Sequence, residues 1–107
     1  MDSRIGAVLE VLHGRQGRPI PAVVLAAHVG LSSGRLSRLF RAATGMPIRR
    51  YVLWLRLRAA LGALQSGDRT LSEAAHEAGF SDAAHLTRTF RRMFGIAPSA
   101  LGGSLRS

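Results

Sequence analysis

The sequence predicts an all-α chain in which two helix-turn-helix units are joined by a long central helix. Apolar residues recur at helical spacing along nearly the whole chain, while the alternation typical of strands is weak. Glycine and proline residues divide this pattern into successive helical segments. Two stretches of the chain also resemble each other. The length of 107 residues suits one small domain or two very small ones that share an interface.

The first half of the chain contains three predicted helices. The first is amphipathic and ends near Gly14, and its buried face repeats at spacings of three and four residues: Ile5, Val8, Leu9 and Leu12. The second begins at Pro21, whose missing N–H costs nothing in a first turn, and stops near Gly30. Ser32 or Ser33 caps the third, which Gly45 ends. Its expected buried face is Leu36, Leu39, Phe40 and Ala43.

Three more helices and a last turn are predicted in the second half. A long helix of about residues 47–66 has the expected buried stripe Leu53, Leu57, Ala60, Leu61 and Leu64. After a turn at Gly67-Asp68, a short helix runs from Leu71 to Ala78 and is stopped by Gly79. Asp82 caps a helix from Ala83 to Phe94, which Gly95 closes and which buries Leu86, Phe90 and Met93. Pro98 starts a last turn. We also expect Phe40, Phe90 and Phe94 in the core.

An internal repeat accounts for two of the helix pairs. Residues 26–32 and 36–41 (AAHVGLS and LSRLFR) resemble residues 75–81 and 86–91 (AHEAGFS and LTRTFR), with one additional residue between the blocks in the second copy. Each copy consists of a helix, a turn with glycine and a second helix that leucine and phenylalanine anchor, which is typical of a helix-turn-helix unit. A plain helical bundle with a duplicated hairpin is the alternative.

The polar face of each second helix argues against the plain bundle. If the apolar faces are buried, the outward faces carry Gly34, Ser37, Arg38 and Arg41 in the first copy and Ala83, Ala84, Thr87, Arg88 and Arg91 in the second. Small residues let a helix lie deep in the major groove of DNA. Arginine can bind guanine through two hydrogen bonds, and a threonine methyl can pack on that of thymine. A face made only for water would typically mix glutamate and lysine.

The charge distribution favours a polyanionic partner. Fifteen basic residues, all arginine, face six acidic ones, and the net charge is +9. No aspartate or glutamate lies between Val11 and Gly67, and such a field of one sign attracts nucleic acid. A solvated basic surface is the alternative. The absence of cysteine excludes disulfides and thiolate sites and fits a reducing cytoplasm. No apolar run approaches the roughly 20 residues of a membrane span.

Other functions find little support. The four histidines are scattered, and Glu73 with His76 is better interpreted as a surface pair than as a metal site. There is no nucleophile–base set or phosphate loop, so we expect no enzyme and no cofactor. A module that binds RNA polymerase or another regulator without reading DNA is the main competing class. Trp54 is expected to pack or make a cation–π contact, and Arg56 to contact phosphate or to brace the two units.

These motifs resemble the DNA-binding domain of the AraC/XylS family of bacterial transcription regulators. The resemblance covers roughly Ile5 to Leu101 and is most specific over residues 75–98, which follow the pattern A-x-x-x-G-F-x-D, [FL]-x-R-x-F-[KR] and G-x-x-P. Residues 36–40 with Gly45, and residues 51–64, also fit. The chain departs from the family at Leu101-Gly102, where an aromatic residue and arginine are usual.

The resemblance implies seven helices, of which the third and sixth, about residues 33–44 and 83–94, enter successive major-groove segments of double-stranded DNA. It implies a first unit of about residues 4–46, a linker helix of about 47–66 and a second unit of about 68–101. A linker rod of ~28 Å fits two recognition helices that lie ~34 Å apart. The implied base contacts are Gly34, Ser37, Arg38, Ala83, Ala84, Thr87 and Arg88. The expected phosphate contacts are Arg35, Arg41, Arg49, Arg50, His85, Arg91 and Arg92.

Members of this family usually carry a second domain that binds an effector or dimerises, and nothing in the 107 residues is long enough to be one. We therefore expect an excised C-terminal domain in preference to a stand-alone protein. It would be a monomer, and a missing N-terminal domain could form a dimer. We expect a cytoplasmic bacterial activator whose partners are DNA and RNA polymerase.

Overall fold

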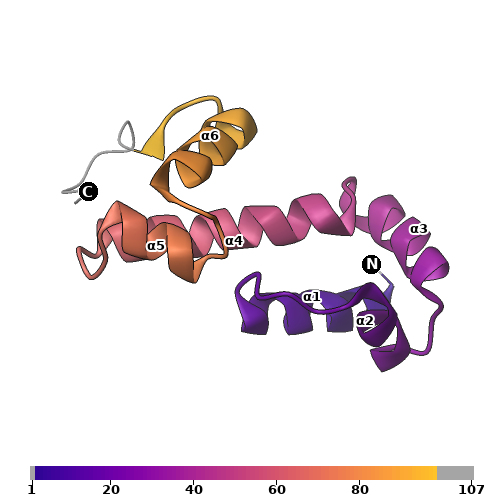
Figure 1. The fold of residues 1–107 in the computed structure, drawn as a ribbon. Coiled ribbons are helices and arrows are strands. Elements are labelled where there is room, and N and C mark those ends of the chain that lie inside the picture. The colour runs from indigo at the N-terminus through magenta and orange to yellow at the C-terminus, as the bar shows by residue number, and fades with distance from the viewer. Residues whose placement is uncertain (1, 99–107) are drawn as a thin grey trace. The chain divides into compact units, whose positions relative to one another are not determined.

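The computed structural model describes residues 2–98, and over these residues it consists of six helices without a strand. The predicted all-α class is therefore confirmed. The helices are α1 (Ser3–Arg15), α2 (Ala22–His28), α3 (Ser33–Thr44), α4 (Ile48–Gln65), α5 (Leu71–Glu77) and α6 (Ala83–Phe94) (Figure 1). The seventh helix, expected after Pro98, lies outside the described residues. The chain divides into two compact units, Met1–Leu55 and Arg56–Ser107, and α4 contributes to both.

The first unit packs α1, α2, α3 and the first half of α4 around one core. Its buried members are Ile5, Val8, Leu12, Leu25, Ala26, Leu36, Phe40 and Leu55. Leu9, Leu31 and Leu39 pack against this core and are half-buried. The helical spacing read from the sequence thus places most of the core of this unit correctly, and the exceptions lie on α3 and α4.

The second unit is built from the remainder of α4 with α5 and α6. Its buried residues are Leu57, Ala60, Leu64, Ala74, Ala75, Phe80, Leu86, Thr89 and Phe90. Thr89 is the polar member of this set, and its Oγ1 donates a hydrogen bond of 2.9 Å to the carbonyl of His85. Because this hydroxyl has a partner within its own helix, its burial costs little.

The internal repeat appears in the two turns as the same pair of backbone hydrogen bonds. In the first unit, Leu31 N–H bonds Ala26 O at 2.9 Å, and the preceding N–H bonds a carbonyl three residues earlier. In the second, Phe80 N–H bonds Ala75 O at 2.8 Å with the same companion bond. Both turns pass through a glycine with positive φ, as this way of ending a helix requires.

Some of the predicted burial in α4 and α3 is wrong. Leu53 and Leu61 are half-buried, whereas Leu55 is buried in the first core. The reason is that α4 serves two cores, so its buried positions change phase along the helix and a single stripe does not describe them. On α3 the residue that follows Phe40 on the inward face of the helix is Thr44, so Ala43 is exposed.

The end of α6 also differs from expectation. Met93 is half-buried, and Phe94 is 38% exposed although its ring centroid lies 4.6 Å from that of Phe90. Apolar spacing predicts which face of a helix turns inward, but not how far along the helix the neighbouring elements cover that face. Phe40 and Phe90 are buried as predicted.

Candidate nucleic-acid interface

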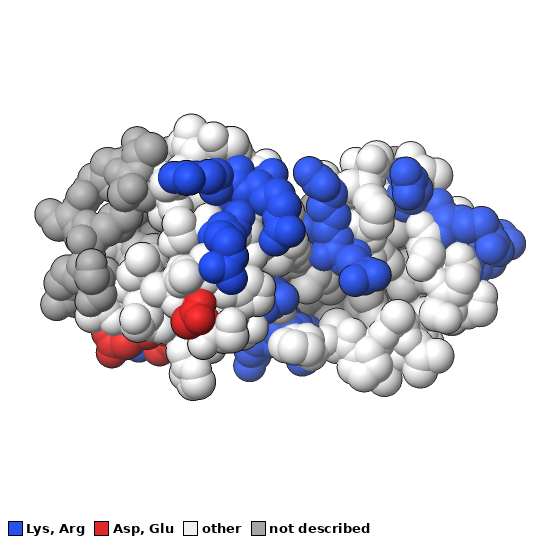
Figure 2. Space-filling view, turned by 45° about the horizontal axis from the view of Figure 1, so that its top comes forward, with Lys and Arg blue, Asp and Glu red and all other residues white. Residues whose placement is uncertain are grey.

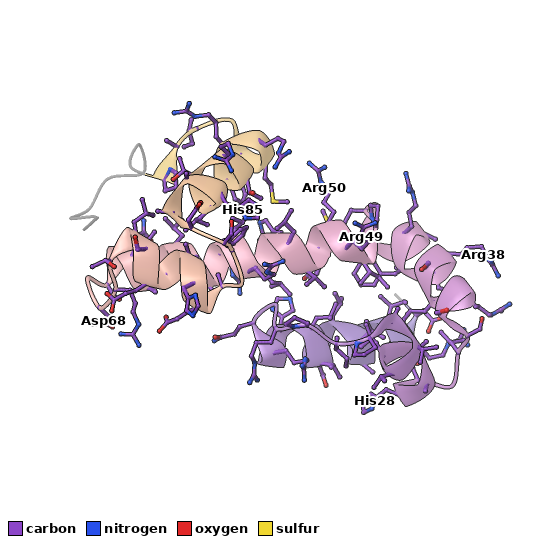
Figure 3. The ribbon with its side chains drawn as sticks, in the orientation of Figure 1. His28, Arg38, Arg49, Arg50, Asp68 and His85 are labelled. Atoms are coloured by element: carbon purple, nitrogen blue, oxygen red, sulfur yellow. The ribbon has the colours of Figure 1, made fainter. Side chains whose placement is uncertain are left out.

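The exposed face of α3 begins at a capped helix N-terminus. Ser32 Oγ accepts a hydrogen bond of 3.2 Å from the backbone N–H of Arg35, which orders the first turn. Gly34, Ser37 and Arg38 are all exposed, and Figure 3 shows Arg38 projecting away from the helix. A Cβ placed on Gly34 would lie 3.9 Å from Nη1 of Arg38, so this guanidinium lies beside the glycine. The start of α3 therefore offers accessible backbone next to a cation.

The exposed face of α6 begins in the same way. Asp82 Oδ1 accepts a hydrogen bond of 2.7 Å from the backbone N–H three residues later, as the N-cap assignment predicts. Ala84 and Arg88 are exposed, while Ala83 and Thr87 are half-buried at the border of the face. The prediction that these residues face outward therefore holds for Ala84 and Arg88. It holds only in part for Ala83 and Thr87.

The predicted phosphate contacts other than His85 are exposed arginines. Within residues 2–98, ion pairs join Arg4 to Asp2 and Arg69 to Glu77, and none involves the members of this set. The set consists of Arg35, Arg41, Arg49, Arg50, Arg91 and Arg92. In the view of Figure 2, arginine side chains form several patches on the surface, and acidic side chains occupy only a small part of it. A cation without an intramolecular partner is available to a phosphate.

The first turn of α4 combines two of these arginines with a helix N-terminus. Arg49 and Arg50 stand just after the start of the helix, where no acidic residue is present, and both project from it in Figure 3. Positive side chains at this end oppose the helix dipole. A bound anion would remove that conflict, because it would pair with the arginines and is favoured by the helix dipole at this end.

His85 differs from the other predicted phosphate contacts because the turn before α6 already engages it. Its Nδ1 accepts a hydrogen bond of 3.3 Å from Ser81 N–H and lies 3.2 Å from Ser81 Oγ. Its ring meets that of Phe80 edge-on, with 5.2 Å between the centroids. The side chain is half-buried. A contact between His85 and phosphate stays a prediction. In the structure, the contacts of His85 with Ser81 and Phe80 order the turn before α6.

Arg56, for which the sequence left two roles open, bonds within the second unit. Its Nε donates a hydrogen bond of 2.8 Å to Ala78 O, and its guanidinium carbon lies 4.8 Å from the centroid of the Phe80 ring. Sequence reasoning missed these partners because they lie more than 20 residues further along the chain. The signal that could have indicated a partner within the protein was the position of this arginine among the apolar residues of α4.

In the first unit, a cluster of aromatic side chains joins α1 to α4. Sequence reasoning missed this cluster. His13 Nε2 lies 2.7 Å from Tyr51 Oη, within hydrogen-bonding distance. The Tyr51 ring meets Phe40 nearly edge-on, with 5.5 Å between centroids, and lies 5.6 Å from the Trp54 ring. Trp54 packs half-buried against the first core, so the packing role predicted for it is confirmed.

The acidic residues of the second unit are engaged in helix ends and turns. Glu73 Oε1 accepts a hydrogen bond of 2.9 Å from Thr70 N–H, and Thr70 Oγ1 accepts one of 3.1 Å from Glu73 N–H. This capping box uses the carboxylate that a metal site with His76 would have needed.

No cluster of three potential metal ligands occurs within residues 2–98. In the same part of the chain, no helix is both long and apolar enough to cross a bilayer.

The pKa of the Asp2 carboxyl is clearly lowered in the folded chain. The carboxylate of Asp2 caps α1 by accepting the Arg4 N–H at 2.8 Å and pairs with the Arg4 guanidinium at 2.9 Å. The hydrogen bond from the Arg4 side chain, followed by the one from its backbone, lowers the pKa of Asp2 from 3.8 to about 2. This group stabilises the start of α1.

Two short helices, each followed by a glycine turn and a capped helix with an exposed arginine face, define a double helix-turn-helix domain that binds DNA. A helix-turn-helix domain family matches residues 25–103, which is well over half of the chain. The chain belongs to this AraC-type family of DNA-binding transcription regulators.

Relatives of known sequence and structure agree with this assignment. The transcriptional activator RhaS of Pectobacterium carotovorum is 39% identical over 77 residues, which cover 72% of this chain and 28% of RhaS. A transcriptional regulator with an AraC-type DNA-binding domain from Chromobacterium violaceum has a TM-score of 0.82 at 28% identity, over 92% of this chain and 88% of that one. The DNA-binding domain of AdpA, solved with a target DNA, has a TM-score of 0.75 at 26% identity, over 91% and 87%. The chain spans about a third or less of the curated relatives.

Proposed function

We propose that the chain reads double-stranded DNA with the exposed N-terminal ends of α3 and α6 and acts as a sequence-specific transcription regulator, not as an enzyme. One observation carries this assignment. In both helices an exposed arginine follows the N-cap by the same number of residues, Arg38 after Ser32 and Arg88 after Asp82. Arginine in the first turns of a recognition helix can bind guanine O6 and N7. AdpA, which has this fold, was solved with its target DNA.

The proposed interface divides into two kinds of contact. Base edges are contacted by Gly34, Ser37 and Arg38 on α3 and by Ala83, Ala84, Thr87 and Arg88 on α6. Phosphates are contacted by Arg35, Arg41, Arg49, Arg50, His85, Arg91 and Arg92. Because most of the base-facing side chains are short, the two arginines supply most direct readout, and DNA shape together with phosphate contacts supplies the rest.

We further propose that the chain acts in the bacterial cytoplasm as part of an activator that contacts RNA polymerase. The support is the relative RhaS, which is a transcriptional activator. Since one chain carries two recognition helices, a monomer of these residues suffices for binding two neighbouring groove segments. Effector binding and dimerisation are assigned to the parts of a longer protein that the relatives have in addition.

The proposal is tested by selecting bound sites from a random duplex pool and measuring the affinity of variants for the selected site. Arg38→Ala and Arg88→Ala should each weaken binding to that site by about 1–3 kcal/mol and relax the base preference at one position. The two variants should lose much less affinity for random duplex. Removing a phosphate contact weakens binding to all sequences alike, whereas removing a base contact does not.

Arg69→Ala provides the matched control. It removes the same charge from an arginine that is ion-paired with Glu77 at 2.8 Å and lies outside both recognition helices. It should leave the affinity for the selected site nearly unchanged. If the two recognition-helix variants lost affinity equally on selected and random duplexes, their arginines would be phosphate contacts and the base-reading assignment would be wrong.

A further inference from the structure

The turn between α5 and α6 is held by a side chain from α4. Arg56 Nε donates a hydrogen bond of 2.8 Å to Ala78 O, the carbonyl of the residue that ends α5. The guanidinium also lies over Phe80, 4.8 Å from the ring centroid. It passes so close to Gly79 that a Cβ there would be 2.8 Å from Arg56 Nη2. One arginine thus lies against the first three residues of the turn, Ala78, Gly79 and Phe80.

The contacts continue from this turn to the first residues of α6. Phe80 is buried, and its ring meets the His85 ring edge-on at a centroid distance of 5.2 Å. His85 Nδ1 in turn accepts the N–H of Ser81 at 3.3 Å, and the His85 N–H bonds the N-cap Asp82 at 2.7 Å. The position of the α6 N-terminus therefore depends on Phe80, which Arg56 covers.

Within residues 2–55, the first unit has no equivalent arrangement. Leu31 stands where the second unit has Phe80, and a Cβ on Gly30 would meet no atom within 4 Å. The first turn leads directly from Leu31 to the N-cap Ser32, whereas the second contains the additional residue Ser81. The longer turn is the one that has the arginine, the aromatic ring and the histidine.

We propose that Arg56 is the positioning residue of the second recognition helix. By fixing the turn through Ala78 and Phe80, it sets where the start of α6, with Ala84 and Arg88, stands against DNA. Arg56 itself contacts neither base nor phosphate in this role. The inference rests on the proposed function of α6, and it predicts that loss of Arg56 weakens readout of one half of the DNA site and leaves the other half unaffected.

The test uses the full chain with the variants Arg56→Gln and Arg56→Lys. Two further duplexes carry the selected site with one or the other half scrambled. The half read by α6 is identified with Arg88→Ala, because scrambling that half abolishes the loss of affinity that this substitution causes. Arg56→Gln should weaken binding to the intact site about tenfold, the order expected from losing a charge-assisted hydrogen bond that orders the helix. The loss should persist when the α3 half is scrambled and vanish when the α6 half is scrambled.

Arg56→Lys separates charge from geometry. A lysine keeps the positive charge but lacks the planar group that can bond a carbonyl and lie on a ring at once. It should therefore restore less than half of the lost affinity in logarithmic terms. Full rescue by lysine, or an equal loss on both halves and on random duplex, would show a non-specific charge effect and overturn the inference. Failure of the wild-type chain to select any site would instead refute the proposed function.

Phe80→Leu covers the case in which Arg56→Gln fails to fold, as judged by circular dichroism. This variant keeps an apolar residue at the position and copies Leu31 of the first unit, so the core stays filled while both ring contacts are lost. It should reproduce the loss on the α6 half of the site. An unchanged affinity on that half would contradict the proposal.

Discussion

Replacing Gly79 with alanine perturbs the packing of Arg56 on its turn while leaving the arginine in place, and the matching change at Gly30 serves as the reference. Both glycines have positive φ, +88° and +72°, where a side chain costs about 1–2 kcal/mol in any surroundings. A Cβ at Gly79 would lie 2.8 Å from Arg56 Nη2, whereas at Gly30 it would meet nothing within 4 Å. The two substitutions therefore differ in what they displace.

The magnitude follows from what Arg56 loses when it moves. Its hydrogen bond to Ala78 O and its contact with the Phe80 ring are worth about 1.5–3 and 0.5–1 kcal/mol when lost entirely. The guanidinium end is flexible, so only part of this is lost. We expect Gly79→Ala to lower the free energy of unfolding by about 1–2 kcal/mol more than Gly30→Ala does.

Urea denaturation followed by circular dichroism measures both changes, and a double-mutant cycle isolates the interaction. In an Arg56→Ala background the alanine at Gly79 has no guanidinium to displace, so its cost should fall to that of Gly30→Ala. If Gly79→Ala cost the same with and without Arg56, the turn would not depend on the arginine and the reasoning would be refuted.

Two further predictions concern the helix starts. Asp2→Ala should lower the stability of α1 near neutral pH. Because the folded pKa of Asp2 is lowered from 3.8 to about 2 by Arg4, this stabilisation is complete above pH 3.8 and is lost as the pH falls to about 2. Wild type and variant should therefore converge over that interval in acid denaturation, and a constant difference would contradict the assignment. Gly34→Ala and Gly62→Ala both add a methyl at an exposed helical position without a clash and should each raise the free energy of unfolding by about 0.5–1 kcal/mol. Only Gly34→Ala should weaken binding to the selected DNA, and equal affinities of the two variants would remove Gly34 from the interface.

Features that depend on nearby residues could be predicted from the sequence. Ser32 and Asp82 cap the helices that they were expected to cap, and Gly45 and Gly95 end them. These signals act within one turn of backbone, so sequence spacing contains them. The exposure of Arg38 was equally predictable, because opposite faces of one helix are related by simple periodicity.

Features that depend on distant residues could not be predicted in the same way. Leu55 looks like any other apolar residue of α4, and only the fold shows that it joins the first core while Leu57 is buried in the second unit. The partners of Arg56, Ala78 and Phe80, lie in the turn after α5, so nearby residues could not show whether this arginine contacts phosphate or bonds within the protein. The exposure of Phe94 depends on how far neighbouring elements extend over α6. The contacts of individual residues with DNA stay predictions.

Because α4 is a single helix that places Leu55 in one core and Leu57 in the other unit, its middle turn belongs to both folding units. Each unit completes its apolar interior only when its own half of this helix is formed. A helix elongates readily from an existing turn but nucleates with difficulty. We therefore expect the unit that folds first to supply the helical nucleus from which the other extends, which would couple the folding of the two units through the shared helix.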